Sequence, residues 1–298
     1  MTRRQFILQS SALATAAATY PACNMANASP STFAMGYQLY SIRDLMTSDP
    51  SGTLSKLKAM GYQHGEVYGF DAVANTIFGV TPAELKHMFD DLGMQATSGH
   101  YDFTTLLEAS DDEMRSYTDK CLACAKTLGS DYLVWPFLRE HQRTLEAYGM
   151  LVEKLNVIGE HLHGSGVGLA YHNHGYEFQD HNGNSGYNMI IAETDADRVK
   201  LQLDMYWLAY DPKKTPAEMI AEQPGRYKMW HIKDMHKVSR DYTELGNGSI
   251  DYSTYLPDPM KSGLEHFYIE QGGNYTVDSL TSAEVSAAFF KENLRNKV

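Results

Sequence analysis

The sequence predicts an α/β protein built as a single (β/α)8 barrel, on three observations. From residue 34 onward, short apolar runs rich in β-branched and aromatic residues alternate with longer amphipathic segments. Eight such runs over roughly 265 residues match the size and order of a (β/α)8 barrel. No glycine-rich phosphate-binding turn follows the first run, which counts against a doubly wound nucleotide-binding sheet. We therefore predict one barrel domain over 29–298.

The eight apolar runs are the predicted barrel strands. Each is four to seven residues long and ends where polar or turn-forming residues begin, as buried parallel strands do. In chain order they are 35–40, 65–68, 95–99, 132–136, 168–173, 200–204, 227–233 and 267–271.

The segments between the strands carry helix signals. Thr81 and Pro82 predict the start of a helix, the first as N-cap and the second as first helical residue. Gly61, Gly93 and Gly129 each stand between a helix and the next strand, where a left-handed C-cap is expected. Three further helices are predicted at 111–128, 145–162 and 281–294.

Composition excludes several classes of protein. With 43% hydrophobic residues in 298, the chain can bury a large core without disulfide staples, and its three cysteines do not form a disulfide scaffold. Cys121 and Cys124, three residues apart within a predicted helix, are expected to pack in the core rather than bind zinc. The formal charge of -12 disfavours nucleic acid as a partner. No apolar run of about 18 residues predicts a membrane span in the mature chain.

Residues 1–28 read as a secretory signal peptide. Arg3 and Arg4, followed by an apolar run, resemble a twin-arginine export signal. Ala28 ends a typical cleavage sequence, which predicts a periplasmic protein that begins near Ser29. Cys23 is a poor site for a lipid anchor because a proline precedes the small residue before it.

Polar residues gather at the carboxyl ends of the predicted strands, where (β/α)8 barrels place their chemistry. Any one of them could be a helix cap or a structural hydrogen-bonding residue. Several carboxylates and imidazoles converging on one barrel mouth would be costly to bury unpaired, and a divalent cation (Mn, Co, Zn or Mg) is the economical explanation. The residues are Glu66, His100, His172, His174, Glu177, Asp204, His231, Lys233 and Glu270.

Short pieces across the mature chain resemble the xylose isomerase-like TIM barrels called sugar phosphate isomerases/epimerases. The matching segments are 36–43, 171–178, 201–207, 230–234 and 245–252. The resemblance implies a metal held by Glu177, Asp204, His231 and Glu270. Many relatives carry the first of these glutamates directly on the fifth strand, where this chain has His172, so His172 or His174 remains an alternative ligand.

The resemblance also implies the reaction class, proton abstraction next to a carbonyl on a sugar or keto-sugar. Glu177, Glu270, His174 and His100 are the candidates for the base. Lys233 is expected either to hydrogen-bond a substrate hydroxyl or oxyanion, or to form an ion pair with a barrel carboxylate. The expected substrate contacts are His100, His172, Gln38, Glu66 and Trp207.

With this resemblance, we predict a metal-dependent sugar isomerase or epimerase, with the oligomeric state left open. Because phosphorylated sugars are mostly cytoplasmic, the predicted export implies an unphosphorylated substrate. A 3-keto-sugar hydratase or lyase of the same fold shares the first chemical step and is the main alternative. A non-catalytic periplasmic sugar-binding protein is a second. A phosphodiesterase like endonuclease IV is disfavoured, because it would want a basic surface and more histidine ligands, whereas the chain is acidic.

Overall fold

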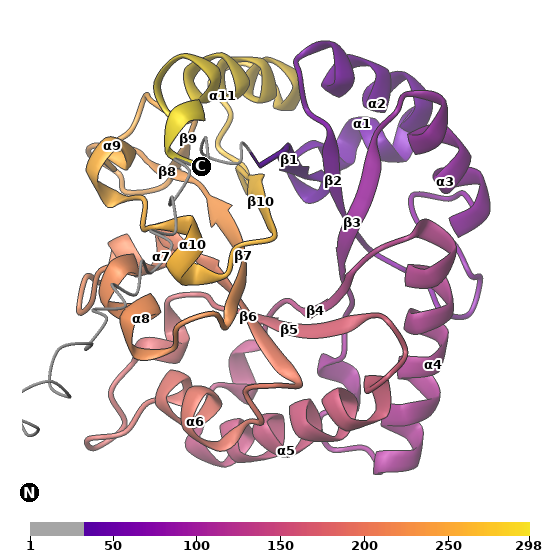
Figure 1. The fold of residues 1–298 in the computed structure, drawn as a ribbon, viewed down its shortest axis with the longest axis vertical. Helices are drawn as coiled ribbons and strands as arrows, with labels where there is room; N and C mark the ends of the chain where they lie inside the picture. The colour runs from indigo at the N-terminus through magenta and orange to yellow at the C-terminus, as the bar shows by residue number, and fades with distance from the viewer. Residues whose placement is uncertain (1–32) are drawn as a thin grey trace, which may run out of the picture. The chain divides into compact units, whose positions relative to one another are not determined.

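The computed structural model describes residues 33–298, and within them eight parallel strands close into a barrel. Pairing of β1 with both β2 and β10 completes the ring, so the predicted (β/α)8 fold is confirmed (Figure 1). The predicted strand bounds agree with the observed ones to within two residues. The strands are β1 (Met35–Gln38), β2 (His64–Tyr68), β3 (Gln95–His100), β4 (Tyr132–Trp135), β5 (Gly168–His172), β6 (Val199–Asp204), β7 (Tyr227–Ile232) and β10 (His266–Ile269).

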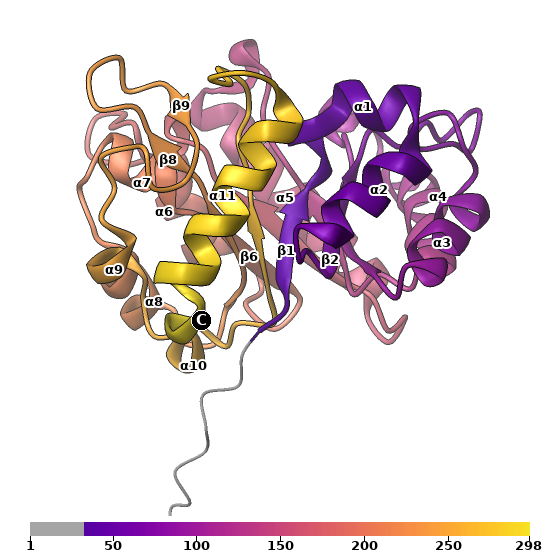
Figure 2. The same cartoon turned by 90° about the horizontal axis from the view of Figure 1, so that it is seen from above.

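Helices surround the strand ring. Figure 2 shows α11 lying alongside β1 and β10, the first and last barrel strands, which pair with each other to close the ring. The α-helices are α1 (Arg43–Ser48), α2 (Pro50–Ala59), α3 (Pro82–Asp91), α4 (Asp111–Leu128), α5 (Leu145–Leu162), α6 (Gly186–Glu193), α7 (Met205–Tyr210), α8 (Pro216–Glu222), α9 (Tyr252–Tyr255), α10 (Pro259–Ser262) and α11 (Ser279–Asn293). Short 3-10 helices lie at Leu39–Ile42, Thr104–Leu106, Glu140–Gln142, Tyr176–Phe178 and Arg295–Lys297.

The helix boundaries follow from local capping chemistry. The Thr81 hydroxyl accepts a hydrogen bond from the backbone N–H of Glu84, and the Thr81 backbone N–H donates one to the Glu84 carboxylate, which makes a capping box with Pro82 at the first helical position. Gly129 ends α4 in the left-handed region at φ 75°. The last helix begins two residues earlier than predicted, because Asp278 caps it.

Apolar side chains of the strands and helices form one large core between the two layers. Cys121 and Cys124 lie buried in α4 as free thiols, as the packing prediction expects, and burial raises the pKa of each. A second, smaller cluster fills the barrel interior, so the barrel is not a pore. Its members are Tyr132, Val134, Ala170, Met229 and Tyr268.

A small hairpin of β8 (Asp234–Met235) and β9 (Tyr242–Thr243) follows β7 and stands at the barrel mouth. The Asp234 carboxylate accepts backbone hydrogen bonds from Gly246 at 2.9 Å, Gly248 at 3.0 Å and Ile250 at 3.2 Å. A Cβ atom at Gly248 would lie 2.0 Å from Asp234 Oδ1, so only glycine fits there. One carboxylate thus ties down the whole loop that follows β7.

Residues 1–28, with Arg3, Arg4 and Cys23, lie outside the described residues, so export and lipidation stay predictions from sequence. In the part of the chain that the structure covers, no helix is both long and apolar enough to span a bilayer.

Candidate active site

A cavity of about 630 Å³ opens at the carboxyl ends of the barrel strands. Its floor contains His100, His172, Lys233 and Glu270, four of the residues predicted to meet there. Its walls are largely aromatic, with side chains from several loops: Tyr40, Tyr68, Phe70, Phe137, Tyr176 and Tyr242. Aromatic faces with a few convergent polar groups are typical of a small-molecule site.

Asp204, His231 and Glu270 lie together beneath this cavity. Their ligand atoms all lie within 4.8 Å of one another, and all three side chains are buried. They come from the ends of β6, β7 and β10, so the barrel register alone brings them together. The structure therefore joins three of the four residues predicted to hold a metal.

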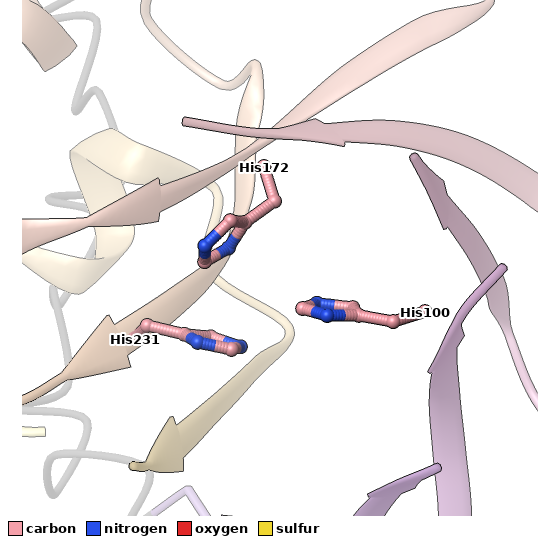
Figure 3. A group of neighbouring side chains, drawn as sticks. All are labelled: His100, His172 and His231. Atoms are coloured by element: carbon pink, nitrogen blue, oxygen red, sulfur yellow. The ribbon is translucent and has the colours of Figure 1, made fainter. Parts of the chain in front are cut away.

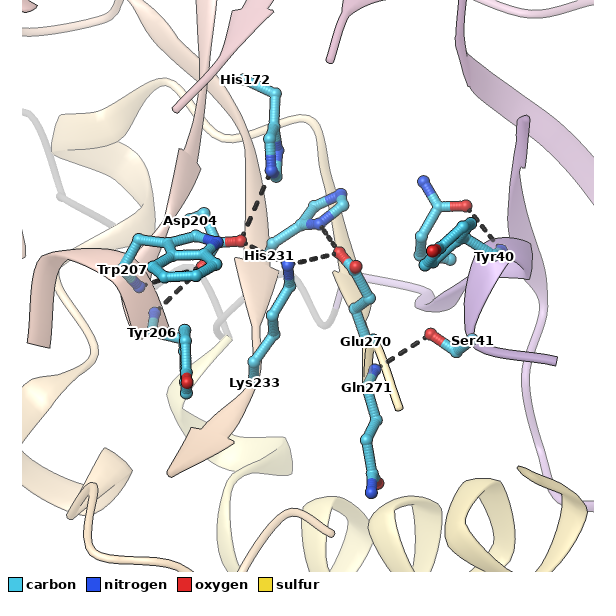
Figure 4. Close-up of polar contacts among 12 residues, drawn as sticks. Tyr40, Ser41, His172, Asp204, Tyr206, Trp207, His231, Lys233, Glu270 and Gln271 are labelled. Carbon is cyan, nitrogen blue, oxygen red and sulfur yellow. Dashed lines mark hydrogen bonds and ion pairs between the residues drawn. The ribbon is translucent and has the colours of Figure 1, made fainter. Parts of the chain in front are cut away.

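The Lys233 ammonium lies between the two carboxylates of this group. Its Nζ is 2.6 Å from Asp204 Oδ2 and 2.9 Å from Glu270 Oε2 (Figure 4). Burial works against the charged ammonium, but the two carboxylates outweigh it and raise the pKa of Lys233. Burial likewise opposes ionisation of Glu270, yet Lys233 and His231 lower the pKa of that carboxyl. Both expected roles of Lys233 are thus compatible with its place, since it forms the ion pairs and also lines the cavity.

The donor set fits a divalent cation. Asp204 Oδ2 is fully buried and accepts no hydrogen bond of good geometry; its close contacts are the Lys233 ion pair and His172 Nε2 at 3.5 Å. Such an oxygen retains lone pairs directed into the group. Two carboxylates and imidazole nitrogen are the ligands that Mn²⁺, Co²⁺ and Zn²⁺ accept in proteins.

Glu66, on β2, is the centre of a buried hydrogen-bond network below the metal group. Its carboxylate contacts Gln38 Nε2 and Ser98 Oγ, both at 2.6 Å, Gln202 Nε2 at 2.7 Å and His231 Nε2 at 2.5 Å. Burial opposes ionisation, but His100 and His231 lower the pKa of Glu66. Gln38 and Glu66 are both completely buried and neither lines the cavity, so their positions do not support the predicted contact with substrate.

The imidazoles of His100, His172 and His231 come from different strands and lie close together (Figure 3). His100 stacks on His231 with ring centroids 5.4 Å apart and planes 8° from parallel, and His172 lies edge-on to His231 at 4.6 Å. His100 Nε2 and His172 Nδ1 each lie 2.8 Å from Gln202 Oε1. His100 and His172 line the cavity and can reach a bound molecule, as predicted.

The structure does not bring Glu177 to the metal group. Its two carboxylate oxygens accept hydrogen bonds from the Tyr171 hydroxyl at 2.7 Å and the His174 backbone N–H at 2.8 Å. Burial raises the pKa of Glu177 to about 7, and the side chain does not line the cavity. Both predicted roles, ligand and base, therefore lack support from its position. His172, at the end of β5, lies next to Asp204 instead.

His174 stands in the cavity wall, with its ring stacked on Tyr176 at 5.3 Å and 10° between the planes. Burial, with Lys233 nearby, lowers the pKa of His174 well below its ordinary value, so the imidazole is neutral. Trp207 packs against it at 5.5 Å but is not among the lining residues, so its position does not support the predicted contact of Trp207 with substrate.

The sequence analysis missed Arg143 and Tyr242, which also line the cavity. Arg143 stacks over the Tyr176 ring at 3.8 Å and donates a hydrogen bond to the Leu138 carbonyl at 3.2 Å. Tyr242 lies on β9, within the loop that Asp234 ties down. Arg143 follows the 3-10 helix Glu140–Gln142 and Tyr242 lies in the short hairpin, so both are beyond the ends of the barrel strands, where a pattern of apolar runs carries no signal.

Comparison with known proteins finds solved structures of similar fold. The chain is similar to the solved structure of a sugar phosphate isomerase/epimerase from Parabacteroides distasonis, with a TM-score of 0.75 and 22% identity over 93% of this chain and 99% of that one. It is also similar to D-allulose 3-epimerase from Methylomonas sp. (TM-score 0.65, 14% identity, 89% and 99% covered). The IOLI protein with a binding zinc atom is a third (TM-score 0.64, 16% identity, 88% and 98% covered).

No curated protein matches the sequence. The sequence model of one family matches residues 54–258, which is well over half of the chain and includes β2 to β7 and the hairpin. By that match, and in keeping with the closed barrel and the polar mouth, the chain belongs to the xylose isomerase-like TIM barrel family.

Proposed function

We propose that this protein is an exported, metal-dependent sugar isomerase or epimerase that acts on an unphosphorylated sugar or keto-sugar by removing a proton next to a carbonyl. The observation that carries the proposal is the group of Asp204, His231 and Glu270, buried together under an aromatic cavity. The buried Asp204 Oδ2 pairs with the Lys233 ammonium at 2.6 Å and accepts no hydrogen bond from an uncharged donor, so this point of the protein favours positive charge.

The residues that would hold the metal are Asp204, His231 and Glu270, with His172 as the fourth in place of Glu177. His172 Nε2 lies 3.5 Å from Asp204 Oδ2, whereas both oxygens of Glu177 are occupied by other hydrogen bonds. When bound, Mn²⁺, Co²⁺, Zn²⁺ or Mg²⁺ supplies Lewis-acid polarisation of the carbonyl and stabilises the charge that develops on its oxygen.

His174 is the proposed base. It is neutral and lines the cavity, so it can accept the proton from the carbon next to the carbonyl. The C–H electron pair then forms the enediolate, and the Lys233 ammonium is placed to donate a hydrogen bond to the developing oxyanion. Returning the proton to the neighbouring carbon, while the hydroxyl proton passes to the former carbonyl oxygen, completes an isomerisation.

The cavity's charges support an unphosphorylated substrate. Among its lining residues the lysine and arginine side chains are Lys233 and Arg143. Lys233 is paired with two carboxylates, and Arg143 is stacked on Tyr176 and bonded to a backbone carbonyl. Neither forms the free cationic cluster that a phosphate dianion favours.

A hydratase or lyase acting on a 3-keto-sugar is the second candidate, and the size of the cavity favours it. About 630 Å³ is typical of pockets that hold drug-sized ligands, so a leaving group attached to the sugar ring has room beside the aromatic wall. The first step is the same proton transfer to His174. The enediolate then expels a group from the adjacent carbon instead of taking the proton back.

The decisive experiment measures the step that both reactions share, which is removal of the proton next to the carbonyl. The protein is loaded with Mn²⁺, Co²⁺ or Zn²⁺, its metal content is measured, and sugars and keto-sugars are incubated with it in D₂O. Deuterium at the carbon next to the carbonyl, read by NMR, is expected with wild type and not with Asp204→Asn. An unchanged product mass apart from deuterium indicates isomerisation, and loss or gain of water or a fragment indicates the lyase or hydratase. Saturable sugar binding without exchange would overturn both enzymes in favour of a binding protein.

A further inference from the structure

We propose that Glu66 is a positioning residue that sets the tautomers of two metal-binding histidines, so that His231 Nδ1 and His172 Nε2 face the same point. The inference rests on the proposed metal site and extends it to a residue below the cavity. Glu66 does this by one direct contact and one relayed through Gln202. Its own carboxylate reaches neither the cavity nor the substrate.

The direct contact is with His231. Glu66 Oε2 lies 2.5 Å from His231 Nε2, and a carboxylate in an ionised state can only accept. Nε2 therefore carries a hydrogen. The other ring nitrogen, Nδ1, faces the Glu270 carboxylate, which by the same rule accepts a hydrogen from it in the metal-free protein, and Nδ1 is the ring atom on the side of the metal group. Histidine ligands are oriented in this way by carboxylates in many metal sites.

The relayed contact runs through the side-chain amide of Gln202. Glu66 Oε1 lies 2.7 Å from the Gln202 nitrogen, and an acceptor-only carboxylate requires the NH₂ group on that side. This neighbour therefore fixes the orientation of the Gln202 amide. The Gln202 oxygen consequently faces His172 Nδ1 at 2.8 Å and His100 Nε2 at 2.8 Å.

An amide oxygen only accepts, so both of those ring nitrogens must carry hydrogens. For a neutral His172, this leaves Nε2 with its lone pair exposed. That atom lies 3.5 Å from Asp204 Oδ2, on the side of the metal group. His172 thus presents Nε2, whereas His231 presents Nδ1, and one buried carboxylate determines both.

The remaining contacts of Glu66 hold it in place for this role. Gln38 donates to one of its oxygens and Ser98 to the other, each at 2.6 Å. Residues from five strands, β1, β2, β3, β6 and β7, meet in this network, so the carboxylate cannot turn without breaking several bonds. A charge completely buried in this way is costly unless each oxygen is bonded, as it is here.

The test is NMR of protein labelled with ¹⁵N in its histidine rings, without metal and loaded with ¹¹³Cd²⁺. In wild type, His172 should carry its proton on Nδ1 in both states, and ¹¹³Cd coupling should appear at His172 Nε2 and His231 Nδ1. Glu66→Gln keeps the shape but can donate as well as accept, so mixed tautomers are expected. Co²⁺ affinity, measured by titration, should fall roughly 10- to 100-fold, as for other groups that orient a ligand.

Two further variants keep the test decisive if Glu66→Gln folds poorly. Gln202→Met should leave His172 in a mixture of tautomers, while His231 keeps its ¹¹³Cd coupling at Nδ1. Ser98→Ala, the matched control, removes one hydrogen bond to Glu66 and one to the Tyr268 hydroxyl but none to a histidine, and should change Co²⁺ affinity by less than about threefold.

The outcomes separate this inference from the proposed function. Wild-type coupling at His172 Nδ1 or His231 Nε2, or an unchanged pattern and affinity in both Glu66→Gln and Gln202→Met, would overturn the role of Glu66 while the metal site stands. A wild-type protein that binds no metal would refute the proposed function. The tautomers of the metal-free protein would then still test Glu66, since a wild-type His172 protonated on Nε2 contradicts the relay.

Discussion

The two ends of the barrel contain hollows of nearly equal volume but opposite character. The cavity at the carboxyl ends of the strands measures about 630 Å³, and a hollow at their amino ends, lined in part by His64, Lys86 and Asp131, measures about 610 Å³. Both ends also carry a histidine beside an aspartate: His266 contacts Asp131 at 2.9 Å, and His172 lies near Asp204. Volume and residue type alone would not distinguish them.

Burial of charge does distinguish the two ends. The Asp131 side chain is 56% exposed, so water screens it, whereas the Asp204 and Glu66 side chains are 0% exposed. Charges removed from water must be neutralised by one another or by a bound ion. The candidate active site is therefore distinguished by buried ionised side chains, which cost free energy to keep out of water. They lie at the carboxyl ends of the strands, where (β/α)8 barrels place their active sites.

The largest expected effect comes from removing one aspartate at each end. Asp204→Asn should lower turnover about a thousandfold, because it removes a metal ligand and several kcal/mol of charge stabilisation in the transition state. Asp131→Asn should leave turnover and metal content unchanged. Elemental analysis measures the metal content of the two variants, and deuterium exchange measures their turnover. Equal losses of turnover and metal in the two variants would contradict the assignment of the active site to the carboxyl end.

A histidine pair gives the next comparison. His174→Gln should lower kcat about a hundredfold or more through loss of the general base, while metal content stays the same. His64→Gln, at the amino end, should keep wild-type kcat. Steady-state kinetics with metal analysis test this pair, and full activity in His174→Gln would move the base to His100 or Glu270.

A lysine pair compares stability rather than turnover. Lys233→Met should destabilise the metal-free protein by about 3–5 kcal/mol, because Asp204 and Glu270 lose the buried cation between them. Lys86→Met removes an ion pair with the exposed Asp90 and should cost less than about 1 kcal/mol. Urea unfolding measures both. Added Mn²⁺ should raise the stability of Lys233→Met more than that of wild type, and equal increases would argue against a shared cation site.

The smallest effect is a pH dependence at the amino end. Burial, with His266 nearby, lowers the pKa of His64 from 6.5 to about 4, and Asp131 opposes the shift. The unfolded chain therefore binds the proton first, and this contribution to stability is present above pH 6.5 and lost as the pH falls toward 4. With solvent screening at this partly exposed site it amounts to about 1 kcal/mol. Wild type should lose that much more stability than His64→Gln over this range, while the exposed control His87→Gln tracks wild type.

The sequence predicts the strand ends well because a barrel leaves them little freedom. Asp204, His231 and Glu270 each come directly after a buried apolar run, and parallel pairing of the strands then brings them to one mouth. Glu177 lies in a short 3-10 helix beyond the end of β5, and its orientation depends on bonds to Tyr171 and His174 that no pattern reveals.

The relay through Gln202 could not be read from sequence for a different reason. A glutamine in an apolar run resembles any strand residue, and its role depends on which way its amide faces. That is decided by Glu66, which is 136 positions away in the chain. Similarly, Arg143 reaches the cavity from a loop, and its place follows from stacking on Tyr176. These contacts depend on side-chain packing that backbone periodicity does not encode.

The Asp234 carboxylate, which gathers the backbone amides of Gly246, Gly248 and Ile250, has a consequence for the kinetics of binding. It fixes the loop carrying Tyr242 before any substrate arrives, so this wall of the cavity loses little conformational entropy on binding. Association should then be a single step, with an observed rate that rises linearly with sugar concentration and does not level off at a loop-closing rate. On the side of β7, the wall of the cavity thus has its binding conformation before the substrate arrives.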